Sequence, residues 1–104
     1  MSALQKNLLD GATANGNGTP IRWRGGKGRF WLLGTMGGAS AKIQWSLDDD
    51  QTGSWFDAKA DGTAQSLSAA GNVETTELPN GWLRAVVSGA TGTTDLDSGI
   101  VSLS

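Results

Sequence analysis

The densest group of side chains that could do chemistry is a run of three acidic residues, Asp48, Asp49 and Asp50. Clustered carboxylate oxygens are ligands that Ca²⁺ prefers. The EF-hand spacing and its closing Glu are absent, and Asp57 and Asp61 would join such a site only if the chain folds back. A glycosidase would need two carboxyl groups across a cleft, and nothing in the sequence marks such a pair. We interpret the run as a solvated turn, with a bound cation as the alternative, and predict no metal site.

The residue types that are missing limit the chemistry further. The chain of 104 residues has no His, the commonest general base and metal ligand, and no Cys, so it has neither a thiolate metal site nor a disulfide. No apolar run approaches the roughly 18 residues of a transmembrane helix, and no signal peptide is visible at the N-terminus. We therefore predict a protein that is not an enzyme, uses no cofactor and binds no membrane. The absence of Cys is compatible with synthesis in a reducing cytoplasm.

A basic segment over residues 22–29 is the first candidate binding element. It has three interpretations: a solvated hairpin tip, a surface that docks on an acidic protein, or a grip on nucleic-acid phosphates. The net charge of −2 argues against nucleic acid, and the glycines run into a strand, whereas a P-loop opens a helix. We predict protein contacts, without nucleic acid, for Arg22, Trp23, Arg24, Lys27 and Arg29.

Charge is divided unevenly along the chain. Residues 1–47 carry six basic residues and one acidic residue, a net of +5, and residues 48–104 carry two basic and nine acidic residues, a net of −7. Such a division could give each subunit complementary patches for self-association or docking. The alternative is that strands from the two halves interleave in space and the charges mix.

The five Trp residues are the most suggestive single feature. Trp45, Trp31 and Trp82 share strand faces with aliphatic residues, so we expect them in the core. Trp23 and Trp55 are the better candidates for an exposed position or an interface. Tryptophan is enriched at protein interfaces, and exposed Trp also stacks on sugars, so glycan binding is an alternative use of these rings.

The elements that must position these residues read as short β-strands. Residues 41–47 alternate between apolar and polar, which predicts a half-buried strand, and 37–58 as a whole predicts a hairpin. Similar patterns recur at 19–24, 29–34, 65–67, 73–78, 82–88 and 98–103, separated by turn signals such as Leu-Pro-Asn-Gly at 78–81. We predict an all-β, single-domain antiparallel β-sandwich or jelly-roll-like barrel of about eight short strands over residues 1–104.

The N-terminal region is expected to stand apart from this domain. Residues 1–18 form an arm and a Gly-rich loop with few means of ordering themselves. A short strand near Leu8 leads out of the arm. We predict that the arm is extended and orders by packing on a partner through Leu4, Leu8 and Leu9.

The amino-acid sequence from residue 30 onward, which is about two-thirds of the chain, resembles that of small structural proteins of tailed bacteriophages. The resemblance is carried by Trp-Leu-Leu-Gly-Thr-Met-Gly-Gly-Ala at 31–39, Ile-Gln-Trp-Ser-Leu-Asp at 43–48, Gly-Ser-Trp-Phe-Asp at 53–57, and the run from Glu-Leu-Pro-Asn-Gly-Trp to Gly-Thr-Thr at 77–94. These motifs are structural turns and strands. The sequence departs from the pattern at Trp45 and Trp82, where Tyr is common.

The resemblance implies a virion component, in the first place a capsid decoration (cement) protein. Such proteins are β-rich, often homotrimeric, and lie on the outer capsid surface, where they stabilise the shell across junctions between major-capsid-protein subunits. A neck, tail or head-fibre protein is the alternative within the same context. A carbohydrate-binding β-sandwich module is the alternative outside it.

Overall fold

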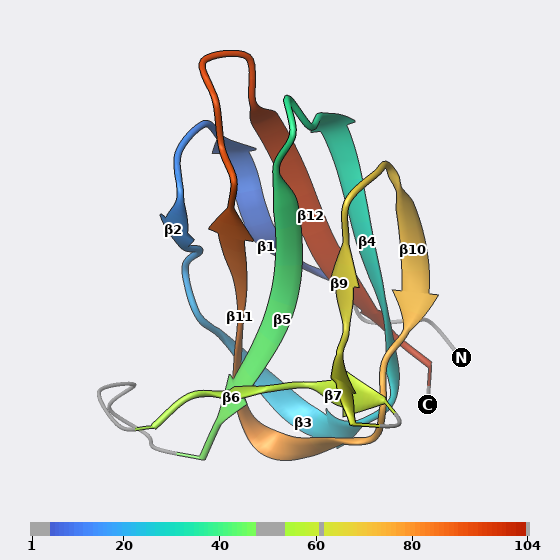
Figure 1. Ribbon diagram of the computed structural model, residues 1–104. Coiled ribbons are helices and arrows are strands. Elements are labelled where there is room, and N and C mark those ends of the chain that lie inside the picture. Colours follow the sequence, from blue (N-terminus) through green and yellow to red (C-terminus); the bar gives the residue numbers. More distant parts are fainter. Residues whose placement is uncertain (1–4, 48–53, 61, 104) are drawn as a thin grey trace.

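The computed structural model describes residues 5–47, 54–60 and 62–103, and these form strands and turns without a helix. Two antiparallel sheets pack face to face as a sandwich, with no closed barrel (Figure 1). The prediction of an all-β antiparallel sandwich is therefore confirmed, and the barrel alternative is wrong. Twelve strands are described, more than the eight predicted, because five of them are only two residues long.

The first sheet has four strands in the order β1-β12-β4-β10. Their bounds are β1 (Gln5–Ala12), β4 (Gly28–Thr35), β10 (Gly71–Glu74) and β12 (Asp95–Ser102). Strands that follow one another along the chain are not neighbours here, since β12 enters between β1 and β4. The last strand of the chain therefore joins the first strand to the rest of this sheet.

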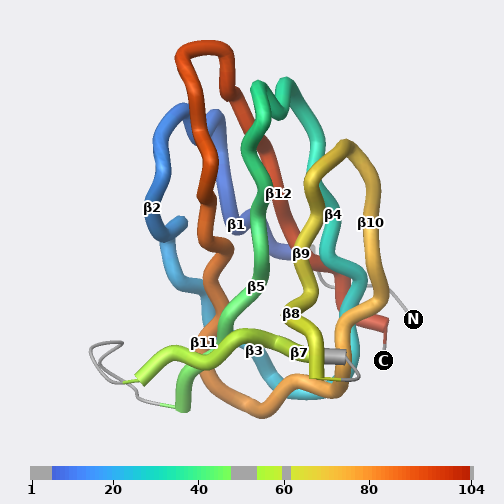
Figure 2. The backbone as a smooth tube through the Cα atoms, viewed as in Figure 1, coloured from blue at the N-terminus to red at the C-terminus, as the bar shows by residue number. Residues whose placement is uncertain are grey.

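The second sheet follows the order β2-β11-β5-β6, with β3 also paired to β11 and β9 also paired to β5. Its strands are β2 (Gly16–Asn17), β3 (Ile21–Gly26), β5 (Ser40–Ser46), β6 (Phe56–Asp57), β9 (Ser66–Leu67) and β11 (Leu78–Ser88). A small hairpin of β7 (Lys59–Ala60) and β8 (Thr63–Ala64) lies between β6 and β9 in the chain. Figure 2 shows β3 crossing the lower end of the sandwich before the chain rises into β4 of the other sheet.

The core lies between the sheets and follows the period of two that strands impose. From the four-stranded sheet come Phe30 and Leu32 of β4 and Leu96 and Ile100 of β12, all fully buried. From the six-stranded sheet come Ala41, Ile43, Leu83, Ala85 and Val87. Burying a side chain of the size of Leu or Phe contributes about 1.5–3 kcal/mol, so this layer holds the sandwich together.

The predicted extended arm is wrong in the part that the structure describes, whereas the short strand expected near Leu8 is confirmed. Residues 5–12 form β1, which pairs along its length with β12. Leu8 and Leu9 are only 2% and 7% exposed and belong to the core. Two successive side chains can both be buried because the register shifts between Asn7 and Leu9, as in a β-bulge. Leu4 lies outside the described residues.

The predicted turn at 78–81 is also wrong. These residues begin β11, which pairs first with β3 and then, from Trp82 onward, with β5. Pro79 lies between the ladder pairs of Leu78 and Asn80, near the start of the strand, where a missing N–H is tolerated. A Cβ at Gly81 would collide with the carbonyl oxygen of Ser46, so glycine here permits close strand approach. The turn-forming residue types therefore serve strand packing.

The face predicted for residues 41–47 holds only for its first half. Ala41 and Ile43 are buried, but Trp45 is half-buried and Leu47 is 61% exposed. The reason is that β5 ends at Ser46, so the alternation stops before Leu47. The hairpin of this region is confirmed, since Gln44 and Trp45 pair with Asp57 and Phe56.

Candidate interaction surface

The structure separates the four cations of the basic segment. β3 belongs to the six-stranded sheet and β4 to the four-stranded sheet. Arg22 and Arg24 are exposed on β3, Lys27 lies in the connection, and Arg29 is exposed on β4. The predicted basic segment is therefore not one surface, and its two halves have different neighbours.

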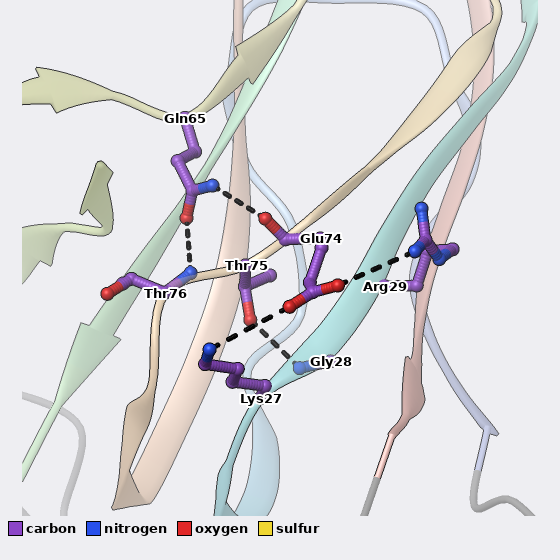
Figure 3. A network of polar contacts seen from close by, with 7 residues as sticks. All are labelled: Lys27, Gly28, Arg29, Gln65, Glu74, Thr75 and Thr76. Carbon is purple, nitrogen blue, oxygen red and sulfur yellow. Dashed lines mark hydrogen bonds and ion pairs between the residues drawn. The ribbon is translucent and has the colours of Figure 1, made fainter. Parts of the chain in front are cut away.

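Lys27 and Arg29 lie beside the edge strand β10 (Figure 3). The carboxylate of Glu74 is 3.8 Å from Nζ of Lys27 and 3.7 Å from Nη2 of Arg29. Arg29 also donates from Nη1 to Oδ1 of Asn72 at 2.9 Å. Exposed ion pairs of this kind contribute at most about 1 kcal/mol. Both cations thus have partners within the fold.

A buried polar network under these ion pairs joins β10 to both sheets (Figure 3). Thr75 donates its N–H to the carbonyl of Gly28 at 2.7 Å and accepts from the N–H of Gly28 through Oγ1 at 2.9 Å. The Gln65 amide donates to the carbonyl of Glu74 and accepts from the N–H of Thr76, both at 2.8 Å. The polar contacts in this region therefore serve the fold.

Three residues predicted to bind a partner are buried. Trp23 is 1% exposed, and its Nε1 donates to the carbonyl of Gly26 at 3.3 Å. Leu8 and Leu9 lie in the core, as described above. The prediction that these three side chains contact a partner is therefore wrong, because each is buried within its own chain.

The outer side of the six-stranded sheet gathers the remaining cations with two Trp residues, and we call it the basic face. Alternation puts Lys42 and Gln44 of β5 on this side, opposite Val86 and Arg84 of β11. Arg22 pairs in register with Trp82 on the same side. The basic face comprises Arg22, Arg24, Lys42, Gln44, Trp55, Asp57, Trp82, Arg84 and Val86. Among the described residues, its charged groups are four cations and one carboxylate, a net of +3.

Arg84 is the centre of a chain of contacts across this face. Its guanidinium lies 4.2 Å from the centroid of the Trp55 ring, and its Nε donates to Oε1 of Gln44 at 2.9 Å. Gln44 donates to Oδ1 of Asp57 at 2.8 Å, and Nζ of Lys42 lies 3.1 Å from the same carboxylate. The bond from Gln44, and then that from Lys42, lowers the pKa of Asp57. Burial lowers the pKa of Arg84.

A second cation–aromatic pair lies beside the first. The guanidinium of Arg22 is 5.7 Å from the centroid of the Trp82 ring. Trp82 is half-buried, and its Nε1 is shielded from solvent without an acceptor among the described residues. Trp55, predicted as an exposed or interface residue, is half-buried under Arg84. Trp82, predicted for the core, instead lies on the outer side.

The outer side of the four-stranded sheet has the opposite charge, and we call it the acidic face. On β4, β10 and β12 it carries Glu74, Asp95 and Asp97 against Arg29, a net of −2 for these three strands. Trp31 lies across Gly99, since a Cβ at Gly99 would be 2.5 Å from Cζ2 of the indole. Leu33, beside Asp97 in the register, is 54% exposed. Trp31, predicted for the core, is half-buried on this outer side.

A hollow of about 580 Å³ lies at the end of the sandwich near Trp45. Its lining includes Trp45, Asp57, Lys59 and Glu77. The ring of Phe56, which is 48% exposed, packs against Trp45 with the ring centroids 4.7 Å apart. The hollow therefore combines the Trp45 ring with side chains that can form hydrogen bonds.

Metal ligands do not cluster in the part of the chain that the structure describes: no group of three His, Cys, Asp or Glu side chains could hold an ion there. Asp48, Asp49 and Asp50 lie outside the described residues. None of the described segments is a helix long and apolar enough to cross a membrane. Comparison of the chain with protein-family models, curated proteins and solved structures finds no match.

Sequence reasoning missed Arg84, Lys42 and Trp82 as parts of a surface. The signal was present in part, because the alternation over 82–88 places Trp82 and Arg84 on one side. That side becomes basic only through the pairing of β11 with β3 and β5, which brings in Arg22 and Lys42. Local pattern does not specify this pairing.

Proposed function

We propose that the chain is a non-enzymatic phage virion structural protein, a capsid decoration protein that binds the outer capsid surface. The observation that supports this best is the basic face, where two Trp and three Arg residues lie on the outside of a well-packed sheet. Trp and Arg dominate the binding energy of protein interfaces. The resemblance of residues 30–94 to phage structural proteins supplies the virion context.

The contacts on this face favour binding over chemistry. Arg84, Gln44, Asp57 and Lys42 are tied to one another, so their positions are set before any partner arrives. Such preorganisation lowers the cost of ordering side chains on association. A catalytic site would instead need a nucleophile beside a base, and the face offers Asp57 with its carboxylate already engaged.

The size of the domain suits a protein that bridges junctions in a shell. Its principal extents are 35 × 32 × 26 Å, so one broad face can supply the roughly 800 Å² per partner of a stable interface. A protein that binds only the assembled shell stabilises it in proportion to the logarithm of its concentration over Kd. We propose that it acts on major-capsid-protein junctions as a homotrimer.

Co-sedimentation with expanded, undecorated capsids tests the proposal. We expect the purified chain to pellet with the capsids at saturable stoichiometry and to raise their disruption temperature, and we expect its solution mass to be that of a trimer. A chain that stays in the supernatant at all concentrations refutes the decoration role. Gold labelling of virions in micrographs distinguishes the capsid from the neck, tail or a fibre.

Carbohydrate binding is a second candidate function, favoured by the hollow near Trp45. Sugars combine apolar faces with hydroxyl groups, and ligand sites of this volume pair aromatic side chains with a few polar groups. Here Trp45 provides the ring, and Asp57 and Glu77 the acceptors. A glycan that quenches Trp fluorescence in the wild type but not in Trp45→Ala would support it, and an unresponsive glycan panel would remove it.

A further inference from the structure

We propose that the basic face is the side that contacts the shell, and that it recognises an acidic protein surface. This inference rests on the proposed decoration function and deepens it by choosing the side and the chemistry of the partner. The starting observation is that the two outer sides of the sandwich differ in sign, +3 on the basic face and −2 on the acidic face. An acidic partner is attracted by the first and repelled by the second.

The geometry of the arginines favours carboxylates as ligands. The hydrogen bond from Arg84 to Gln44 uses Nε only, so the two terminal nitrogens stay outside that bond. Arg84 is held from two sides, by the Trp55 ring at 4.2 Å and by Gln44. A planar guanidinium held in this way can bind a carboxylate through two parallel hydrogen bonds, at a low entropic cost. Arg22 lies over the Trp82 ring at the longer distance of 5.7 Å, on the strand next to β11.

Three further residues define the extent of the surface. Arg24 is exposed on the same side of β3 as Arg22, two residues further along the strand. Val86 contributes a half-buried apolar side chain opposite Lys42 in the register. The face thus alternates cations with aromatic and apolar side chains, and Trp and Arg are the residue types that contribute most at interfaces.

Nucleic acid is the other polyanion to consider, and the geometry disfavours it. Proteins that bind single strands stack bases on open aromatic faces. Here guanidinium groups already lie over both Trp55 and Trp82. An acidic protein surface fits these features better.

Charge reversal on the two sides tests the inference. One variant carries Arg22→Glu and Arg84→Glu on the basic face, and the matched control carries Lys27→Glu and Arg29→Glu beside β10. Both change the net charge by the same amount. We expect the first to weaken capsid binding at least about tenfold and the second to change it less than about twofold. Wild-type binding should also weaken as the salt concentration rises from about 50 to about 300 mM, a range that includes the physiological ionic strength.

Each outcome decides between the two proposals. If the wild type does not bind capsids, the decoration function fails and the inference fails with it. If the wild type binds and the basic-face variant binds equally well, the function stands and the inference is overturned. Equal losses in both variants, or displacement of the chain from capsids by a single-stranded oligonucleotide, also overturn it. Should the double variant unfold in circular dichroism, Arg24→Glu alone replaces it, since that side chain is exposed, with an expected loss of about threefold.

Discussion

Gln65 is a buried polar side chain that connects two segments of the sandwich, and its removal should lower the free energy of unfolding. It is 7% exposed, and its amide pairs with two backbone groups of the neighbouring segment, the carbonyl of Glu74 and the N–H of Thr76 (Figure 3). Its own backbone N–H donates to the carbonyl of Ala58 at 2.8 Å. Gln65→Ala keeps the backbone bond and removes both bonds of the amide. The variant therefore isolates the contribution of the side chain.

The expected loss follows from the two backbone groups left without a partner. Each buried polar group that loses its partner costs about 1–3 kcal/mol. Both bonds are partly buried, so water can reach part of the vacated space, and the low end of that range applies. We expect Gln65→Ala to lower the free energy of unfolding by about 2–3 kcal/mol. For a chain of this length that corresponds to a fall in Tm of roughly 8–20 °C.

Urea unfolding followed by Trp fluorescence measures this loss, and Gln65→Glu is the matched variant. An ionised Glu can accept from Thr76 but cannot donate to the carbonyl of Glu74, whereas a protonated Glu can do both. Burial and the carbonyl should raise the folded pKa of this Glu above its ordinary value. Its stability relative to wild type should then be highest below the unfolded pKa and fall as the pH rises through the folded pKa. A loss below about 1 kcal/mol in Gln65→Ala would refute the reasoning.

Three further variants test other parts of the structure. The folded pKa of Asp57 is lowered, so its contribution to the free energy of unfolding is present above the unfolded pKa and is lost as the pH falls through the folded pKa. The stability difference between wild type and Asp57→Asn should therefore shrink from about pH 7 to about pH 3, a range that includes the ordinary Asp pKa. Urea titrations at each pH measure this difference. Trp82→Phe should cost under about 1 kcal/mol, because it removes an N–H without an acceptor; a larger loss would show that Nε1 is paired. Gly99→Ala should cost about 1–3 kcal/mol and shift Trp emission, because the new Cβ would be 2.7 Å from the carbonyl oxygen of Lys6 as well as against Trp31; an unchanged Tm would contradict the packing.

Much of the fold could be predicted because alternation and turn residues are local signals. The pattern over 41–47 located β5, and the pattern over 82–88 located the second half of β11. Local pattern indicates a short strand near Leu8, but it gives neither the pairing of β1 nor the burial of both leucines. Leu8 and Leu9 are adjacent, and a regular strand would bury only one of them; the bulge that buries both depends on pairing with β12, almost ninety residues away.

The candidate surface was harder to predict than the fold, since its contacts are set by register. Arg22 and Trp82 lie 60 positions apart in the sequence and become neighbours only because β3 pairs with β11. Trp23, adjacent to Arg22, takes the opposite side of the same strand and is buried. Residue type suggested Trp23 and Trp55 as the exposed or interface tryptophans, whereas the register buries Trp23 and places Trp82 on the outer side of the sheet.

The uneven charge along the chain is only partly preserved in space. Arg29 comes from the basic half of the sequence and lies on the acidic face, and Arg84 comes from the acidic half and lies on the basic face. These exchanges alone would mix the charges of the two halves of the chain, which is the outcome expected if their strands interleave in space. The faces still differ in sign because Glu74, Asp95 and Asp97 all belong to the four-stranded sheet, while Asp57 is the single acid among the described residues of the basic face. Sheet membership, more than position in the sequence, therefore determines where an acidic partner would be attracted.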